Sequence, residues 1–247
     1  MNSEVTELVF ILDRSGSMSS MAKEAVGGFN SFLEEQKKLP GDAKLTVALF
    51  DHEYMLLCDG KNIKEVEPLT DKTYEPRGTT ALLDAVGRTL DQVGKRINSA
   101  NHSCSACGTD TKKPTKVLVA ILTDGLENAS KDYKKARINE MIAHHKKNHD
   151  WQFLFLAANQ DAFSEGSSLG VLHNMSMNYT MDSAGFSKGF GTLNTSAKLY
   201  RAVSTDAFST AVASNSIGDL TDDQGNENPI VQDLINKSVD VKDKDAK

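Results

Sequence analysis

Several features that would direct a chain of 247 residues to a membrane or to the cell exterior are missing from this sequence. No apolar run approaches the roughly 18 residues that a membrane span requires. Residues 1–4 contain neither the basic nor the apolar segment of a secretory signal. The three cysteines are an odd number and do not form a disulfide framework. These absences predict a reduced, cytoplasmic protein without a membrane association.

An excess of basic charge is also missing. The 28 lysines and arginines are outnumbered by 34 aspartates and glutamates, which gives a net charge of -6. Binding of nucleic acid needs a basic face, so we expect no nucleic-acid partner. Hydrophobic residues make up 39% of the chain and charged residues 25%, and this balance is typical of a folded protein with a packed core.

An uninterrupted apolar run over residues 8–12 ends abruptly in the sequence DRSGS at residues 13–17. Such a run predicts a strand that is buried on both faces. The side chains of Asp13, Ser15 and Ser17 would then lie at the carboxyl end of a strand, where open α/β sheets bind their ligands. Oxygen atoms that converge on a tight loop favour a hard cation such as Mg²⁺ or Ca²⁺.

Strands and helices alternate along the rest of the chain. Strands are predicted over residues 8–12, 45–50, 54–58, 117–122, 153–157 and 174–179. Helices are predicted over residues 21–38, 81–97, 133–147, 162–169, 183–204 and 206–216. The alternation indicates an α/β fold, a three-layer, doubly wound and mostly parallel sheet with one antiparallel edge strand. Because the carboxyl ends of parallel strands share one rim, Asp13 and Asp124 are predicted to meet there.

Three motifs in this order resemble the von Willebrand factor type A domain. Its metal-ion-dependent adhesion site uses an Asp-x-Ser-x-Ser motif after the first strand, a threonine before a central helix and an aspartate after the fourth strand. The matching residues in this sequence are Asp13, Ser15, Ser17, Thr79 and Asp124. The resemblance covers about residues 6–180 and implies the fold described above.

The resemblance also implies a role for each of these side chains. Ser15 and Ser17 would ligate the ion directly, and Thr79 would do so directly or through water. Asp13 and Asp124 would act mainly through water and by hydrogen bonds to the ligating hydroxyls. Neutral hydroxyls leave the cation electrophilic, so it would take a carboxylate of a partner protein's Asp or Glu as a further ligand. Mg²⁺ suits such an incomplete protein shell, and Mn²⁺ and Ca²⁺ remain alternatives.

We predict a division of the chain into three parts. The type A domain would span residues 6–180, with a cysteine-bearing insertion at 98–114. Residues 181–216 would form a C-terminal helical extension. Residues 217–247 are rich in Asp, Asn, Lys and Gly and are predicted to be a flexible polar tail.

The insertion carries a second candidate site, made of His102, Cys104 and Cys107. A structural zinc site needs four ligands, and a thioredoxin-type redox pair sits at a helix start, so neither pattern is complete here. Zinc binding, redox chemistry and an ordinary loop all remain open for this segment.

Three further histidines and one further aspartate have simpler interpretations. His144, His145 and His149 cluster near the end of a predicted helix, and we interpret them as cations at the negative end of its dipole rather than as metal ligands. Asp161 precedes a predicted helix and is interpreted as its cap.

These features predict a binding module and not an enzyme. The module would be an intracellular adaptor or assembly factor that captures an acidic side chain of its partner. The alternative is a magnesium-dependent phosphoryl-transfer or hydrolytic enzyme. Phosphatases that resemble haloacid dehalogenases need an acid two residues after the nucleophile, and that position is Ser15 here. The chain also has no phosphate-binding P-loop. A zinc or redox accessory that uses the cysteine loop is the third hypothesis.

Overall fold

The computed structural model describes residues 4–100, 114–158 and 161–236. One six-stranded sheet has the order β3-β2-β1-β4-β5-β6. β3 runs antiparallel to β2, and the other neighbouring strands are parallel. The strands are β1 (Val5–Asp13), β2 (Asp42–Phe50), β3 (Tyr54–Asn62), β4 (Lys116–Thr123), β5 (Gln152–Ala158) and β6 (Ser176–Tyr179). The predicted mostly parallel sheet with one antiparallel edge strand is therefore confirmed.

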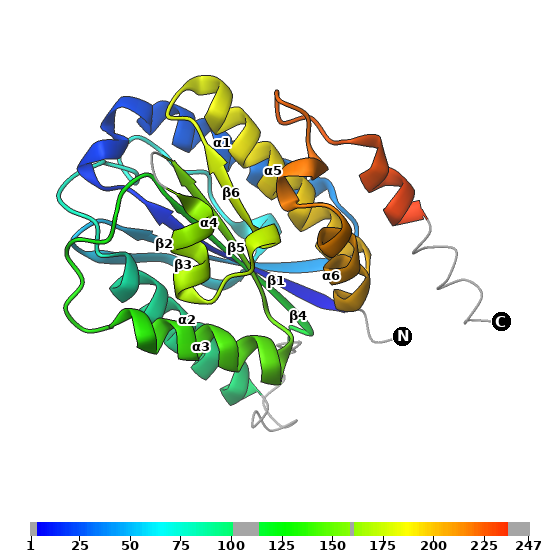
Figure 1. Ribbon diagram of the computed structural model, residues 1–247, viewed down its shortest axis with the longest axis horizontal. Helices are drawn as coiled ribbons and strands as arrows, with labels where there is room; N and C mark the ends of the chain where they lie inside the picture. Colours follow the sequence, from blue (N-terminus) through cyan, green and yellow to red (C-terminus); the bar gives the residue numbers. More distant parts are fainter. Residues whose placement is uncertain (1–3, 101–113, 159–160, 237–247) are drawn as a thin grey trace.

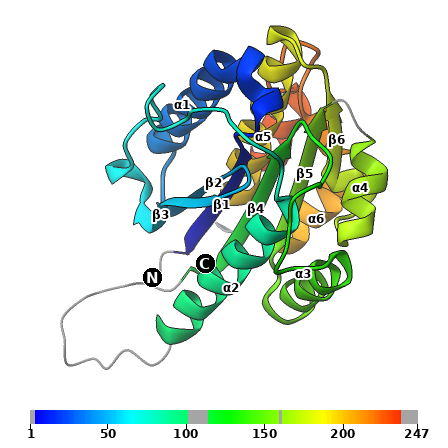
Figure 2. The ribbon, with the colours of Figure 1, turned by 90° about the vertical axis from the view of Figure 1, so that its left-hand side faces the viewer.

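Helices cover both faces of this sheet. Figures 1 and 2 show α1 and α5 on one face and α2 and α3 on the other. The helices are α1 (Ala22–Lys38), α2 (Leu82–Ala100), α3 (Lys135–His149), α4 (Ala162–Leu169), α5 (Ser183–Ala202) and α6 (Thr205–Ser214). This arrangement gives the three layers that the alternation of elements predicts. Within the described residues, none of the helices combines the length and apolar character that crossing a membrane requires.

The central strands β1 and β4 are buried along their whole length. Each lies between two other strands and beneath helices on both sides, so apolar side chains are needed on both of its faces. The register pairs Leu12 of β1 with Leu122 of β4. The residues that follow these two leucines therefore come side by side at the carboxyl rim of the sheet.

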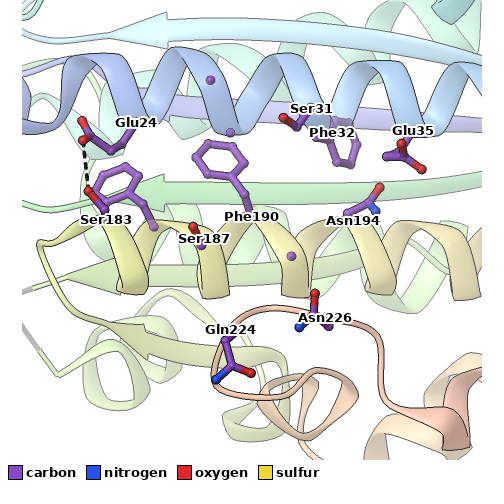
Figure 3. A pocket seen from close by; sticks show the side chains of 14 residues that line it. Glu24, Ser31, Phe32, Glu35, Ser183, Ser187, Phe190, Asn194, Gln224 and Asn226 are labelled. Atoms are coloured by element: carbon purple, nitrogen blue, oxygen red, sulfur yellow. Dashed lines mark hydrogen bonds between the residues drawn. The ribbon is translucent and has the colours of Figure 1, made fainter.

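Helix α5 packs in the same layer as α1, and a glycine allows the close approach. A Cβ atom on Gly28 of α1 would lie only 2.2 Å from Cδ2 of Phe190 on α5. Figure 3 shows the Phe190 ring pointing from α5 toward α1, beside a cavity of about 570 Å³. The proposed boundary at residue 180 stays a prediction, and the helix that follows it contributes to the same core.

The predicted polar tail is packed against the protein over residues 217–236, which corrects this part of the sequence prediction. Ile217, Leu220 and Val231 are fully buried, and residues 229–236 are helical. These apolar residues are widely spaced among polar ones, so the composition of the segment conceals them. Residues 237–247 lie outside the described part of the chain.

The last turn of α3 holds a partly buried imidazole. His145 stacks on Trp151 with the ring centroids 4.0 Å apart. Burial, followed by the charges of His149 and His144, lowers the pKa of His145 to about 4, and the charge of Asp91 opposes this shift. At neutral pH the ring is uncharged, so it does not act as the cation that we predicted at the end of this helix.

Acid is therefore expected to destabilise the protein as the pH falls from 6.5 to about 4. In this window the unfolded chain binds a proton at His145 that the folded chain binds less readily, so the stabilisation present above pH 6.5 is lost as the pH approaches 4. His145→Phe keeps a ring against Trp151 and removes the titration. Urea unfolding at several pH values should give a flatter pH profile for this variant than for wild type. His173→Phe, on the exposed 3-10 turn, is the control, and identical slopes for wild type and His145→Phe would contradict the assignment.

Candidate metal centre

Oxygen-bearing side chains meet at the carboxyl rim where β1 and β4 end. Asp13 is the last residue of β1, and Asp124 directly follows β4. Ser17 lies in a 3-10 turn, η1 (Gly16–Met21), and its Oγ donates to Oδ1 of Asp124 at 2.8 Å. The Oγ atoms of Ser15 and Ser17 are 3.1 Å apart. The structure thus brings four of the five predicted side chains together around one point of the rim.

Asp13 holds the loop and the neighbouring strand in place. Its Oδ1 accepts the backbone N–H of Ser15 at 2.7 Å, and its Oδ2 accepts the hydroxyl of Thr123 at 2.6 Å. Burial raises the pKa of Asp13 to about 6, and the hydrogen bonds from Thr123 and Ser15 act in the opposite direction. The carboxylate is thus fully engaged by protein groups, which suits a residue that orients the ligating hydroxyls.

One carboxylate oxygen of Asp124 has no hydrogen-bond donor among the described residues. This atom, Oδ2, is buried. Burial also raises the pKa of this carboxyl group. A buried acceptor without a partner costs about 1–3 kcal/mol, and a bound cation removes this cost. Because the surrounding donors are hydroxyl and carboxylate oxygens, the residues present fit a hard divalent cation.

The fifth side chain at the rim is Thr80, and the predicted Thr79 is not part of the cluster. Thr80 is only 3% exposed, whereas Thr79 is exposed. A Cβ atom on Gly125 would lie 3.0 Å from Oγ1 of Thr80 and 3.7 Å from Oγ of Ser17. The two hydroxyls therefore flank the same glycine, directly after Asp124.

The backbone around this threonine explains why the sequence prediction is displaced by one residue. Gly78 has a φ of +64°, and a Cβ atom there would collide with the ring of His52. Two hydrogen bonds then hold Thr80, because its N–H donates to Oδ1 of Asn128 at 2.9 Å and its carbonyl accepts the N–H of Asn128 at 3.0 Å. In the sequence, the one local sign is that Thr80 directly precedes the apolar start of the helix.

An ion-pair cluster beside the centre was not predicted from the sequence, in which residues 51–53 are only the short link between two predicted strands. Asp51 is fully buried, and its Oδ2 lies 3.0 Å from Nε of Arg14 and 3.0 Å from Nε of Arg77. Asp51, His52 and Glu53 offer three ligand atoms within 4.8 Å of one another. Because two guanidinium groups already neutralise Asp51, we interpret this cluster as an anchor for the rim loops.

The remaining candidates have different outcomes. His102, Cys104 and Cys107 lie outside the described residues, so zinc and redox roles for that loop stay predictions. Asp161 caps α4, because its Oδ1 accepts the N–H groups of Phe163 and Ser164 at 3.1 Å each. The interpretation of Asp161 as a helix cap is therefore confirmed.

No protein-family model matches the sequence, and no curated protein matches it significantly. The structure is similar to that of proximal thread matrix protein 1 from the mussel byssus, with a TM-score of 0.55 and 14% identity over 81% of this chain and 47% of that chain. The chain thus spans about half the length of the mussel protein. It is also similar to the vWF domain of the type V pili tip protein Mfa5 from Porphyromonas gingivalis, with a TM-score of 0.52 and 11% identity over 78% of this chain and 96% of that one. At these identities the similarity concerns the fold, and this chain has the fold of the von Willebrand factor type A domains.

Proposed function

We propose that this chain is a divalent-metal-dependent binding module that captures an acidic side chain of a partner protein. The observation that carries the proposal is the buried Oδ2 of Asp124, which lacks a hydrogen-bond partner among the described residues and belongs to a cluster of hydroxyls. Ser15, Ser17 and Thr80 would offer neutral oxygens to the ion, and Asp13 would orient them. Mg²⁺ is the ion we propose, because it retains open or water-filled positions in such a shell.

The chemistry of this donor set favours an anionic ligand from outside. Hydroxyl ligands do not neutralise a divalent ion, and both oxygens of Asp13 already accept hydrogen bonds, so Oδ2 of Asp124 is the one carboxylate oxygen of the pair left to face it. The bound ion would therefore supply a positive charge to which a carboxylate binds. We propose capture rather than catalysis, and an intracellular adaptor or assembly role, in line with the sequence prediction.

An exposed apolar residue beside the centre supports a protein as the partner. Leu126 follows Asp124 by two residues and is 63% exposed. The loop that carries it is held in place, because Glu127 accepts the N–H groups of Leu83 and Ser130 at 2.9 and 2.7 Å. An exposed apolar side chain next to a metal centre offers contact area that a free small anion cannot use.

Asp13→Asn is expected to weaken the binding of Mn²⁺, used as a spectroscopic substitute for Mg²⁺, by about 10–100-fold. Asparagine keeps the size of the side chain and one acceptor oxygen, but it removes the charge and replaces the second acceptor with an N–H donor. Thr80→Ala should weaken Mn²⁺ binding by about tenfold or more, whereas the matched control Thr79→Ala should leave it unchanged. Electron paramagnetic resonance of free Mn²⁺ measures all three affinities.

Partner capture is tested with the same variants. Immobilised wild-type chain is incubated with cell extract in Mg²⁺ and then in chelator, and the retained proteins are compared with those retained by Asp13→Asn. Capture that is lost in chelator and in Asp13→Asn, but kept by Thr79→Ala, supports the proposal. Mn²⁺ affinity that is unchanged in both Asp13→Asn and Thr80→Ala, with circular dichroism showing intact folding, would rule it out.

A further inference from the structure

Three imidazole rings gather at the opposite end of the sheet from Asp13. His144, His145 and His149 belong to α3, whose last residue precedes the start of β5. Their ring centroids are 5.5, 5.5 and 5.7 Å apart. His145 and His149 are four residues apart, so they share one face of the helix. The folded chain thus holds the three rings as a compact group.

One nitrogen in this group lacks a partner. Nδ1 of His145 is buried and has no hydrogen bond to any described residue. Stacking on Trp151 limits the rotation of this ring. The amide Nδ2 of Asn148 donates to Nδ1 of His144 at 2.9 Å, and because both side chains are exposed, a metal ion bound at Nδ1 would replace this contact. An unpaired buried nitrogen beside two more imidazoles is a favourable environment for a metal ion.

We propose that His144, His145 and His149 form a second metal site, which takes a transition-metal ion such as Zn²⁺ and is independent of the oxygen-lined centre. Imidazole nitrogen suits Zn²⁺, Ni²⁺ and Cu²⁺, whereas Mg²⁺ prefers oxygen. A zinc ion lies about 2.1 Å from each ligating nitrogen, so the rings must turn before their nitrogens converge on one ion. Water would complete the coordination.

Binding requires a rearrangement of exposed side chains only. In the present rotamers, the ligand nitrogens of the three histidines do not all lie within 4.8 Å of one another. Among the described residues, Asp51, His52 and Glu53 meet that criterion. His144 and His149 are exposed, and exposed side chains change rotamer within nanoseconds. The more buried His145 supplies the fixed position, and the other two rings turn toward it.

The surroundings supply access and charge. The groove between α2 and α3 holds a cavity of about 440 Å³, which Asp91, Glu140 and His144 line together with the cations Lys95 and Arg137. A second cavity of about 320 Å³ is also lined by His145, together with His149 and Trp151. An ion therefore reaches the cluster from solvent. Burial lowers the pKa of His145, which keeps its ring unprotonated and able to ligate at neutral pH.

The test is Zn²⁺ binding by the full chain, measured by isothermal titration calorimetry at neutral pH in excess Mg²⁺. Cys104→Ser and Cys107→Ser are present in every sample, so that the thiolates of these two residues do not contribute. His145→Asn and His149→Asn are each expected to weaken Zn²⁺ binding by about tenfold or more, and His173→Asn is the matched control. Because protonated imidazole does not ligate, the affinity should also fall on acidification.

The Zn²⁺ titrations can fail or succeed independently of the Mn²⁺ measurements that test the oxygen-lined centre. Zinc affinity that falls in the two α3 variants while Mn²⁺ binding persists supports a second site. Zinc affinity that is unchanged in both variants, or that falls equally in His173→Asn, overturns the proposal. A third variant, His144→Asn, should also lose affinity, and circular dichroism of each variant excludes unfolding as the cause.

Discussion

Replacing Arg96 with methionine is expected to lower the free energy of unfolding by about 3–5 kcal/mol. Arg96 of α2 forms an ion pair with Glu7, a fully buried residue of the central strand β1. It also reaches Asp59 of β3, with Nε 2.6 Å from Oδ1. Without the guanidinium, the Glu7 carboxylate keeps one hydrogen bond within the described part of the chain, from the Thr46 hydroxyl at 2.8 Å. A buried carboxylate that loses its counter-ion is strongly destabilising, because it leaves an uncompensated charge in the protein interior.

A double variant separates the loss of the ion pair from the loss of packing. Glu7→Gln removes the charge and keeps the shape, so Glu7→Gln/Arg96→Met should recover much of the stability that Arg96→Met loses. Urea denaturation at neutral pH measures both. If Arg96→Met unfolds at the same urea concentration as wild type, then Glu7 does not depend on this ion pair.

Replacing Lys116 with methionine is expected to cost about 3 kcal/mol. Lys116 begins β4 and is 5% exposed, and its Nζ donates to the carbonyls of Tyr200 at 2.6 Å and Val203 at 2.8 Å. These carbonyls belong to the last turn of α5 and the residue that follows it, where helical hydrogen bonds end. A buried ammonium thus ties the C-terminus of α5 to the central sheet. The variant leaves these carbonyls without their charged donor.

Thermal unfolding provides the measurement, with an expected fall in the melting temperature of roughly 6–12 °C. Lys37→Met is the matched control, because Lys37 makes an exposed pair with Glu34 on the surface of α1. Such surface pairs contribute little to stability. Equal melting temperatures for Lys116→Met and Lys37→Met would show that the carbonyls at the end of α5 find other donors.

The class of fold could be predicted because each element carries its own signal. The apolar run at residues 8–12 has no polar alternation, and such a strand is stable only when both faces are covered. The helix predicted over residues 162–169 has the same bounds in the structure, because Asp161 caps its start and Gly170, with a φ of +95°, ends it. Signals of this kind depend only on residues that are close in the sequence, so they can be recognised before the fold is known.

The site was only partly predictable. Asp13 and Asp124 follow two buried strands, and parallel strands bring such positions to one rim. Choosing between Thr79 and Thr80 requires the turn at Gly78, where the ring of His52 from a distant hairpin leaves no room for a side chain. No property of two adjacent threonines reveals that contact in advance.

By itself, the sequence determined the order of strands and helices, the buried character of β1 and β4, and the polar residues that follow both strands. The tertiary structure alone decided that Thr80 faces Ser17, that residues 217–236 pack against the protein, and that the ring of His145 stacks on Trp151. The physical reason is the range of the interactions. Periodicity and capping act within a few residues, whereas the neighbours of a side chain across the fold depend on segments that only folding brings together.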